Sequence, residues 1–165
     1  MSNDKLIPKQ TVEVTVTGLG STGEGVGKVN GFTVFAHGGL PGEIVKVKLE
    51  SVKKTYALGR TVDILKSSPD RCEPVCPIYE ECGGCQLQHL NYEAQLKIKT
   101  QQVKDAITRI GHLKNVEVLP TLRAVEPTFY RNKMQVPVAA NEGKLELGRF
   151  AASTHPVLNV DNCFI

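Results

Sequence analysis

Apolar and polar residues alternate in short runs along the first part of the chain. Val12, Val14 and Val16 are separated by polar residues, the period-two pattern of a strand with one buried face. Four segments carry an extended pattern of this kind: residues 12–16, 32–36, 44–49 and 56–64. Short strands spaced this closely bury a core most economically by closing into a small barrel. The pattern therefore predicts a barrel over residues 10–66.

Five glycines interrupt the pattern between residues 17 and 28. Glycine adopts backbone conformations that other residues avoid, and it lets a second backbone approach closely. We therefore expect this stretch to turn sharply or to pack against another backbone segment.

The hydrophobic period lengthens to between three and four over residues 91–110. Apolar residues recur at this spacing with lysines between them, which predicts an amphipathic helix. Asn91 is suited to cap the start of this helix, and Gly111 is suited to end it.

After the helix, residues 129–138 and 144–150 have the pattern of two strands around the turn-rich sequence Ala-Asn-Glu-Gly, which predicts a hairpin. A further extended piece covers residues 157–160. The expected fold is mainly β with one amphipathic helix. Residues 1–9 would form a flexible tail, and residues 67–165 would hold a cysteine loop, the helix and part of a β-rich domain.

The composition fits a soluble globular protein, with 41% hydrophobic and 22% charged residues. No apolar leader precedes the predicted barrel, so we expect a cytoplasmic monomer without a membrane partner. The formal net charge of +3 does not by itself indicate a nucleic-acid partner. In a reducing compartment, clustered cysteines are more often metal ligands than disulfides.

Three cysteines, Cys76, Cys82 and Cys85, lie within ten residues, and Cys163 follows near the end of the sequence. Two thiolates separated by a Gly-Gly pair can point at one centre because the turn between them is tight. Zinc and iron–sulfur clusters both accept four cysteines. Three ligands in one loop with a distant fourth favour an iron–sulfur cluster, while a structural zinc site or no metal stays open from the spacing alone.

The segment Glu-Cys-Gly-Gly-Cys-Gln-Leu-Gln-His at residues 81–89 closely resembles the RNA uracil-5-methyltransferases, which methylate C5 of uridine in ribosomal and transfer RNA. Residues 10–66 resemble the TRAM domain, a small oligonucleotide-binding-type barrel. Residues 129–138 resemble the start of the family's central β-rich domain. The resemblance thus implies an RNA partner and a TRAM barrel followed by part of that central domain.

The same resemblance implies which cysteines hold a metal. Cys76, Cys82, Cys85 and Cys163 match the four ligands of a [4Fe-4S] cluster in the family. Cys72 falls outside this pattern and is interpreted as a spare thiol.

The family's chemistry requires parts that cannot be located in these residues. Its members use S-adenosylmethionine, bound in a C-terminal domain that also supplies a cysteine nucleophile and a carboxylate base. Here no strand is followed by a glycine-rich, nucleoside-binding helix. We therefore assign no catalytic residue, interpret the sequence as a piece of a longer protein, and expect it to be inactive alone.

Two functions from different classes follow. The first is the RNA-recognition portion of a 23S rRNA or tRNA uracil-C5 methyltransferase, in which S-adenosylmethionine is bound only by the full-length protein and the cluster supports structure and RNA binding. The alternative is a stand-alone RNA-binding module with a structural zinc site. Zinc without iron or labile sulfide would favour the alternative.

Cations and one aromatic residue cluster on the last two predicted strands of the barrel and on their connection. Single-stranded RNA is bound by cations that contact phosphates and by aromatic rings that stack on bases. The candidates are Lys46, Lys48, Lys53, Lys54, Tyr56 and Arg60. Lysines on an exposed strand face are also ordinary solvated residues, which is the structural alternative for each of them.

Arg131 and Lys133 flank Asn132 at the start of the predicted hairpin. Alternate residues of a strand share one face, so both cations would project to the same side. They are candidates for contacts with the backbone of a folded RNA. The competing interpretation is a solvated edge that prevents pairing with another strand.

Overall fold

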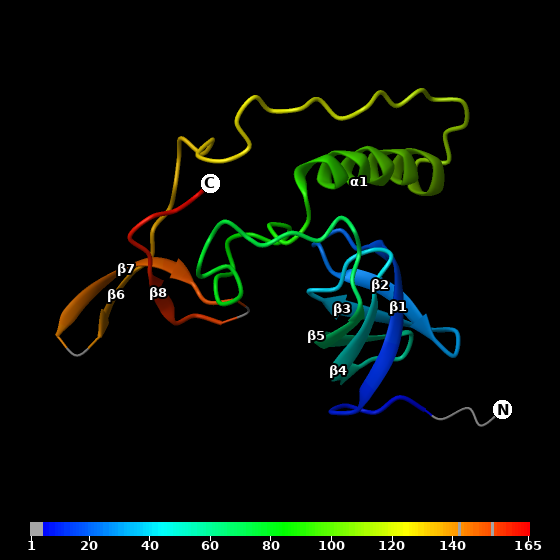
Figure 1. Cartoon of the computed structure of the whole chain (residues 1–165), viewed down its shortest axis with the longest axis horizontal. Helices are drawn as coiled ribbons and strands as arrows, with labels where there is room; N and C mark the ends of the chain where they lie inside the picture. Colours follow the sequence, from blue (N-terminus) through cyan, green and yellow to red (C-terminus); the bar gives the residue numbers. More distant parts are fainter. Residues whose placement is uncertain (1–4, 142, 153) are drawn as a thin grey trace. The chain divides into compact units, whose positions relative to one another are not determined.

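A computed structural model describes residues 5–141, 143–152 and 154–165 (Figure 1). The chain divides into two compact units, Met1–Arg71 and Cys72–Ile165. The first unit is the predicted barrel, and the second contains the cysteine loop, the helix and a small sheet. The expected fold class, mainly β with one amphipathic helix, is confirmed.

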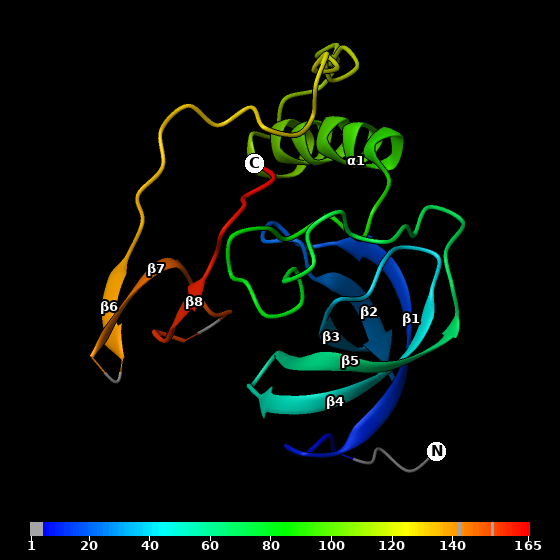
Figure 2. The same cartoon turned by 60° about the vertical axis from the view of Figure 1, so that its left-hand side comes forward.

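The barrel of the first unit is closed and has five strands. These are β1 (Thr11–Leu19), β2 (Gly25–Val29), β3 (Phe32–His37), β4 (Ile44–Val52) and β5 (Tyr56–Lys66). Their order around the barrel is β1-β2-β3-β5-β4, and antiparallel pairing of β1 with β4 completes the circle (Figure 2). Because β3 and β5 pair in parallel, the chain crosses over through β4 between them.

Alternate residues of the strands fill the barrel with valine. Val14, Val34, Val45 and Val47 have no exposed surface. Burying side chains of this size contributes about 1.5–3 kcal/mol each. Leu6 packs into the same core, although it belongs to the segment 1–9 that we expected to be a tail.

The glycine-rich stretch forms β2 and its approaches, and it combines both expected roles. Gly23 adopts a φ of 96°, which favours glycine, in the turn before β2. At Gly27 a Cβ atom would overlap the Thr15 carbonyl oxygen of β1. Glycine is therefore required there for the close approach of two strands.

A buried ion pair joins Glu43, directly before β4, to Arg71, the last residue of the first unit. The Glu43 side chain is fully buried and accepts hydrogen bonds from Arg71 Nε at 2.7 Å and from Arg71 Nη2 at 2.8 Å. Backbone N–H groups of Leu40 and Ser68 also donate to this carboxylate. Burial opposes its charge, but the Arg71 and backbone hydrogen bonds outweigh burial and lower the pKa of Glu43.

The helix of the second unit begins where the sequence predicts. It consists of α1 (Tyr92–Asp105) followed by one π-helical turn, η1 (Ala106–Ile110). The Asn91 side chain caps the start by accepting from the Ala94 N–H at 2.8 Å, and Gly111 follows the last turn. Ala94 is its one buried residue among those described. The apolar stripe is therefore present but largely uncovered within this unit.

A three-stranded antiparallel sheet follows the helix. It contains β6 (Val138–Asn141), β7 (Lys144–Phe150) and β8 (Val157–Asn159), in that order. The β6–β7 pair is the predicted hairpin, with Asn141 opposite Lys144. Part of its expected turn, Glu142, lies outside the described residues.

The predicted strand over residues 129–138 is wrong for all but its last residue. Residues 129–137 form no strand, although the Pro137 carbonyl accepts from the Gly148 N–H of β7 at 3.3 Å, and β6 begins only at Val138. Two local causes oppose a strand here: Phe129 has a φ of 52°, and Pro137 lacks the N–H that a ladder requires.

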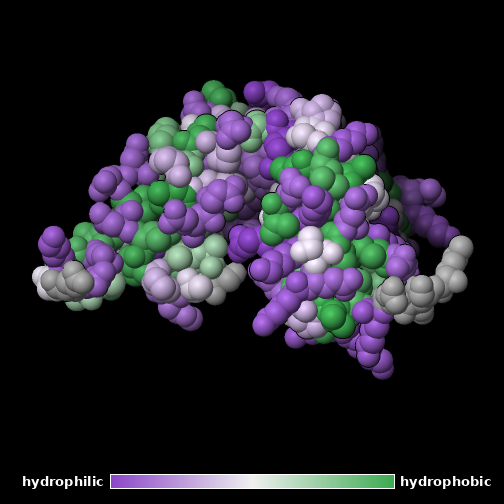
Figure 3. Space-filling model, turned by 60° about the horizontal axis from the view of Figure 1, so that its bottom comes forward, coloured by the Kyte–Doolittle hydropathy of each residue, from purple (hydrophilic) through white to green (hydrophobic). Residues whose placement is uncertain are grey.

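The small sheet carries apolar side chains at the surface on its edge strand β6 and on its central strand β7. Val138, Leu145 and Leu147 are each more than half exposed. The face drawn in Figure 3 likewise shows hydrophobic residues among hydrophilic ones. Apolar exposure on this scale marks the sheet as a surface that other protein segments can cover.

Candidate functional site

Local turns shape the loop that carries Cys76, Cys82 and Cys85. The Cys82 N–H donates to the Ile78 carbonyl at 2.9 Å, one helical turn back along the chain. The Gly84 N–H then donates to Cys82 Sγ at 3.3 Å. The Gly-Gly pair thus folds the backbone around one sulfur, as expected for two thiols that face a common centre.

Backbone hydrogen bonds join this loop to the end of β7. The Gly83 N–H donates to the Phe150 carbonyl at 3.1 Å, and the Ala152 N–H donates to the Glu81 carbonyl at 2.8 Å. Cys82 and Ala151 form a β-bridge between these two bonds. The loop is therefore held in register with the connection that leads into β8 and onward to Cys163.

The last residues of the chain return to the same region. The Phe129 N–H donates to the Phe164 carbonyl at 3.0 Å, and the two rings are 5.6 Å apart. Arg149, on β7, points a guanidinium nitrogen at Cys163 Sγ at 3.9 Å. Cys163 is thus positioned by contacts on both sides.

The pKa shifts of two cysteines reflect this convergence. Burial raises the pKa of the Cys85 thiol, a hydrogen bond with Gln88 lowers it, and negative charge on Cys82, Cys163 and Cys76 raises it further. The other three cysteines therefore lie within electrostatic reach of Cys85.

At Cys163 the balance is the opposite. Burial disfavours the thiolate, but hydrogen bonds with the Ile165 backbone and Arg149, with the charges of Arg149 and Arg131, lower the pKa of Cys163. The fourth cysteine is thus set in a cationic surrounding.

The cysteine side chains are not arranged around a single metal-ion position. Within the described part of the chain, no three His, Cys, Asp or Glu side chains are close enough to hold a single metal ion. All five cysteines are free and partly buried. A four-iron cluster is larger than one ion and is held by thiolates that stand farther apart. Four cysteines are a donor set that both zinc and a four-iron cluster accept.

Neighbouring polar side chains organise the loop. Gln88 Oε1 accepts from the Cys76 N–H at 3.2 Å, and Tyr79 Oη is hydrogen-bonded to His89 Nδ1. Cys72, interpreted from the sequence as a spare thiol, donates to the Gln88 carbonyl at 3.4 Å. Gln88 and His89, which follow the cysteines in the sequence, therefore stabilise the loop through hydrogen bonds.

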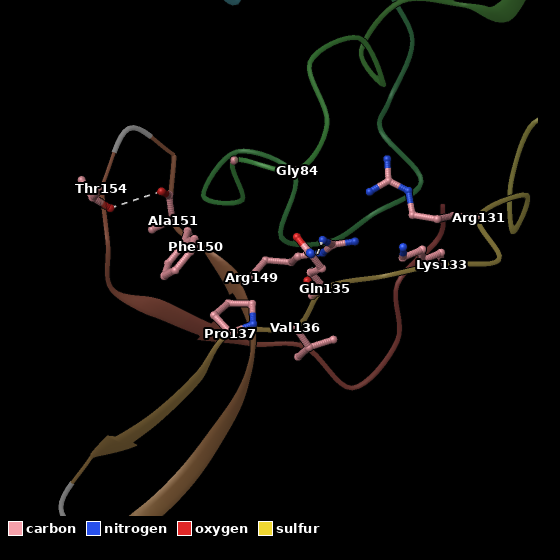
Figure 4. Close-up of a pocket in the computed structure, with 11 residues that line it drawn as sticks. Gly84, Arg131, Lys133, Gln135, Val136, Pro137, Arg149, Phe150, Ala151 and Thr154 are labelled. Atoms are coloured by element: carbon pink, nitrogen blue, oxygen red, sulfur yellow. Dashed lines mark hydrogen bonds between the residues drawn. The ribbon is translucent and has the colours of Figure 1, made fainter.

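A pocket of about 790 Å³ lies next to the loop, within the second unit (Figure 4). The predicted residues Arg131 and Lys133 both line it, so the structure brings them together. Arg149 and Phe150, which sequence reasoning missed, line it as well. Their one sequence signal was alternation along residues 144–150, which places neighbours on opposite faces and does not single out either side chain.

The six barrel candidates lie on β4, on β5 or on the connection between these strands. Lys48 and Arg60 face each other across β4 and β5, and Lys46 lies opposite Asp63 with an ion pair of 3.0 Å. Lys53 and Lys54 occupy the connection between the strands and are exposed.

Two contacts limit how free this surface is. Arg60 also lies 3.8 Å from Glu50, and the Tyr56 ring packs edge-on against Phe35 with centroids 5.6 Å apart. Lys48, Lys53 and Lys54 have no ion pair among the described residues, which leaves them most available to a polyanion.

No helix in the described ranges combines the length and apolar character needed to cross a membrane.

Two comparisons with known proteins cover different parts of the chain: one covers the barrel, and the other covers most of the chain. The family model of the TRAM domain matches residues 7–62. An uncharacterized RNA methyltransferase of Halalkalibacterium halodurans is 47% identical over 154 residues, which cover 93% of this chain and 34% of that protein. One of Clostridium tetani is 44% identical over 94% of this chain and 34% of its own length. The chain thus spans about a third of the length of these curated relatives.

A solved structure shares the fold. The tRNA (uracil-54, C5)-methyltransferase of Pyrococcus abyssi, in complex with S-adenosyl-L-homocysteine, matches with a TM-score of 0.54 and 24% identity. The match covers 92% of this chain and 32% of that protein. The match shows that this chain shares a known fold.

Proposed function

We propose that this chain is the RNA-recognition portion of an S-adenosylmethionine-dependent RNA methyltransferase that methylates C5 of uracil in 23S rRNA or tRNA. The match of the TRAM domain to residues 7–62 and the similarity to RNA methyltransferases over most of the chain support this proposal. RNA is then the partner of both units, and the methyl donor binds to a part of the whole protein outside these 165 residues.

One observation carries this proposal beyond family membership. The loop with three cysteines is hydrogen-bonded to the end of β7, and Cys163 is placed in the same region by Arg149 and Phe129. Residues far apart in the sequence are thus brought into one region that contains thiols and cations, which supports the proposal. A stand-alone barrel would need no such centre.

We assign Cys76, Cys82, Cys85 and Cys163 as ligands of a [4Fe-4S] cluster. A cluster bound by these four thiolates would cross-link the loop to the end of the chain. Its binding free energy would add to the folding free energy of this region. The residues around it do the positioning: Gln88 fixes the Cys76 backbone, the Gly84 N–H donates to Cys82 Sγ, and Arg149 balances negative charge at Cys163.

The barrel supplies a second contact surface. Lys46, Lys48, Lys53, Lys54 and Arg60 would contact phosphates, and Tyr56 would offer a ring edge or face to a base. Lys48, Lys53 and Lys54 are the strongest of these, since Lys46 and Arg60 already face carboxylates. The barrel strands thus act as a cationic platform and not as a catalytic element.

The decisive experiment for the activity uses the complete protein. It would be incubated with methyl-labelled S-adenosylmethionine and bulk rRNA and tRNA, and nucleosides would be separated by mass spectrometry. We expect label in 5-methyluridine. Label in a different nucleoside, or in protein alone, would contradict the assignment to uracil C5.

A further inference from the structure

All described charged residues that line the pocket beside the cysteine loop are cations. Arg131 and Lys133 come from the segment before β6, and Arg149 comes from β7. No acidic side chain is among the described residues that line it, and none of these three cations takes part in an ion pair there. Although Arg131 and Arg149 also lie within electrostatic reach of Cys163, a lining whose described residues include three cations and no carboxylate favours an anionic ligand.

The contacts of the three cations divide their roles. Arg149 is engaged with the protein, at 3.5 Å from the Gln135 carbonyl and 3.9 Å from Cys163 Sγ. Arg131 and Lys133 are exposed and make no hydrogen bond among the described residues. The position of Arg149 is explained by its contact with the Cys163 thiol. Lys133 has no such contact with a cysteine among the described residues.

An aromatic residue completes the pocket. Phe150 is 48% exposed, and His155 packs against it at an edge with centroids 5.9 Å apart. Val136 and Pro137 add apolar surface to the lining. Figure 4 shows Phe150 and Pro137 at one end of the pocket and Arg131 and Lys133 at the other. The volume, about 790 Å³, is in the range of sites that enclose small ligands.

We propose that this pocket binds one unpaired nucleotide of the RNA, with Arg131 and Lys133 on its phosphate and Phe150 against its base. This inference rests on the proposed RNA-binding function and adds the site. A phosphate needs charge-assisted donors, and an unpaired base needs an apolar ring face. The pocket presents both at opposite ends, whereas a plain anion site would not need the aromatic end.

The first test removes the phosphate end. Hexauridylate binding to the intact protein, purified anaerobically, would be measured by fluorescence anisotropy over a salt series. Arg131→Gln/Lys133→Gln is expected to weaken binding about tenfold and to reduce the salt slope by about 0.7 for each phosphate that is no longer neutralised. The matched control is Lys97→Gln/Lys99→Gln, which removes the same charge from exposed positions on α1.

The results separate the two levels of the proposal. Equal weakening by the control and by the pocket variant would overturn the nucleotide site while leaving RNA binding intact. An unaltered protein that does not bind hexauridylate at any salt concentration would contradict the proposed function as well. Displacement of hexauridylate by an equal concentration of inorganic phosphate would show a general anion site and would also overturn the nucleotide assignment.

The second test examines the base end and does not depend on charge. Phe150→Leu is expected to weaken hexauridylate binding about tenfold, because the aromatic ring that stacks on one base is removed, while binding of an abasic hexamer of the same backbone stays unchanged. A purely structural role of Phe150 would weaken both ligands and would refute base binding. Photocrosslinking of the unaltered protein with a 4-thiouridine hexamer should label residues 131–137 or 149–154, and labelling confined to the barrel would refute the pocket.

Discussion

Glu43 shows how a single residue determines the stability of the barrel unit. Its carboxylate is fully buried, yet Arg71 and two backbone N–H groups satisfy it. Removing one partner of a buried ion pair is costly because the other charge remains without a partner. Nothing in the sequence marks this pair, since the two residues are 28 positions apart and follow no motif.

We predict that Glu43→Gln lowers the free energy of unfolding by about 3 kcal/mol at pH 7. Urea unfolding followed by circular dichroism measures this directly. The control is Glu50→Gln, whose exposed side chain is 3.8 Å from Arg60 and should contribute less than about 1 kcal/mol. Equal losses of stability in both variants would contradict the role of the buried pair.

The same pair predicts a pH dependence. The pKa of Glu43 is lowered in the folded protein, so its stabilising effect is complete above the unfolded value of about 4.3. The effect should then fade as the pH drops below that value toward the folded pKa. Unfolding curves of the unaltered protein and of Glu43→Gln should therefore converge in acid. A constant difference down to a pH of about 3, well below the unfolded value, would show that the carboxylate charge is not responsible.

At the scale of elements, alternation alone located most of the barrel strands, because each buries one face in a common core. It failed at residues 129–137, where Phe129 has a positive φ and Pro137 lacks the N–H that a ladder requires. The helix ends were predictable from Asn91 and Gly111. The pocket was not predictable, because it depends on Arg149 meeting a loop that lies far earlier in the chain.

The β7–β8 pair is the element that connects the sheet to Cys163. Gly148 lies opposite Asn159, and a Cβ atom there would overlap the Leu158 carbonyl oxygen. We predict that Gly148→Ala forces the two strands apart and lowers the iron content of anaerobically purified protein by more than half, although every cysteine is retained. Gly18→Ala, which meets nothing within 4 Å, is the control and should keep its iron. Full iron content in Gly148→Ala would show that Cys163 does not depend on this pairing.

At the scale of the whole molecule, the two units are proposed to share one RNA. The barrel contributes exposed lysines, and the second unit contributes the cysteine centre and the pocket. The fold class could be predicted because alternation is a local signal, whereas the assignment of the four cysteines to a metal stays a prediction. The identity of the RNA could not be predicted, because the chain spans about a third of the length of the curated relatives it matches, and that choice depends on contacts distributed over all domains.

Salt dependence measures the contribution of the barrel. Replacing Lys53, Lys54 and Arg60 together by Gln should flatten the plot of log affinity against log salt by about 0.7 for each phosphate that these cations neutralise. Hexauridylate anisotropy is the measurement, with Lys97→Gln/Lys99→Gln/Lys104→Gln on α1 as the charge-matched control. A slope that stays unchanged would remove this surface from the RNA interface.

The central claim is that Cys76, Cys82, Cys85 and Cys163 hold one [4Fe-4S] cluster. Iron and acid-labile sulfide should be quantified in anaerobically purified protein, beside Cys163→Ser and the control Cys72→Ser. We predict about four irons and four sulfides per chain in the unaltered protein, the same content in Cys72→Ser, and loss of most of both in Cys163→Ser. Zinc in place of iron, or a Cys163→Ser variant that keeps its full iron and sulfide, would contradict the claim.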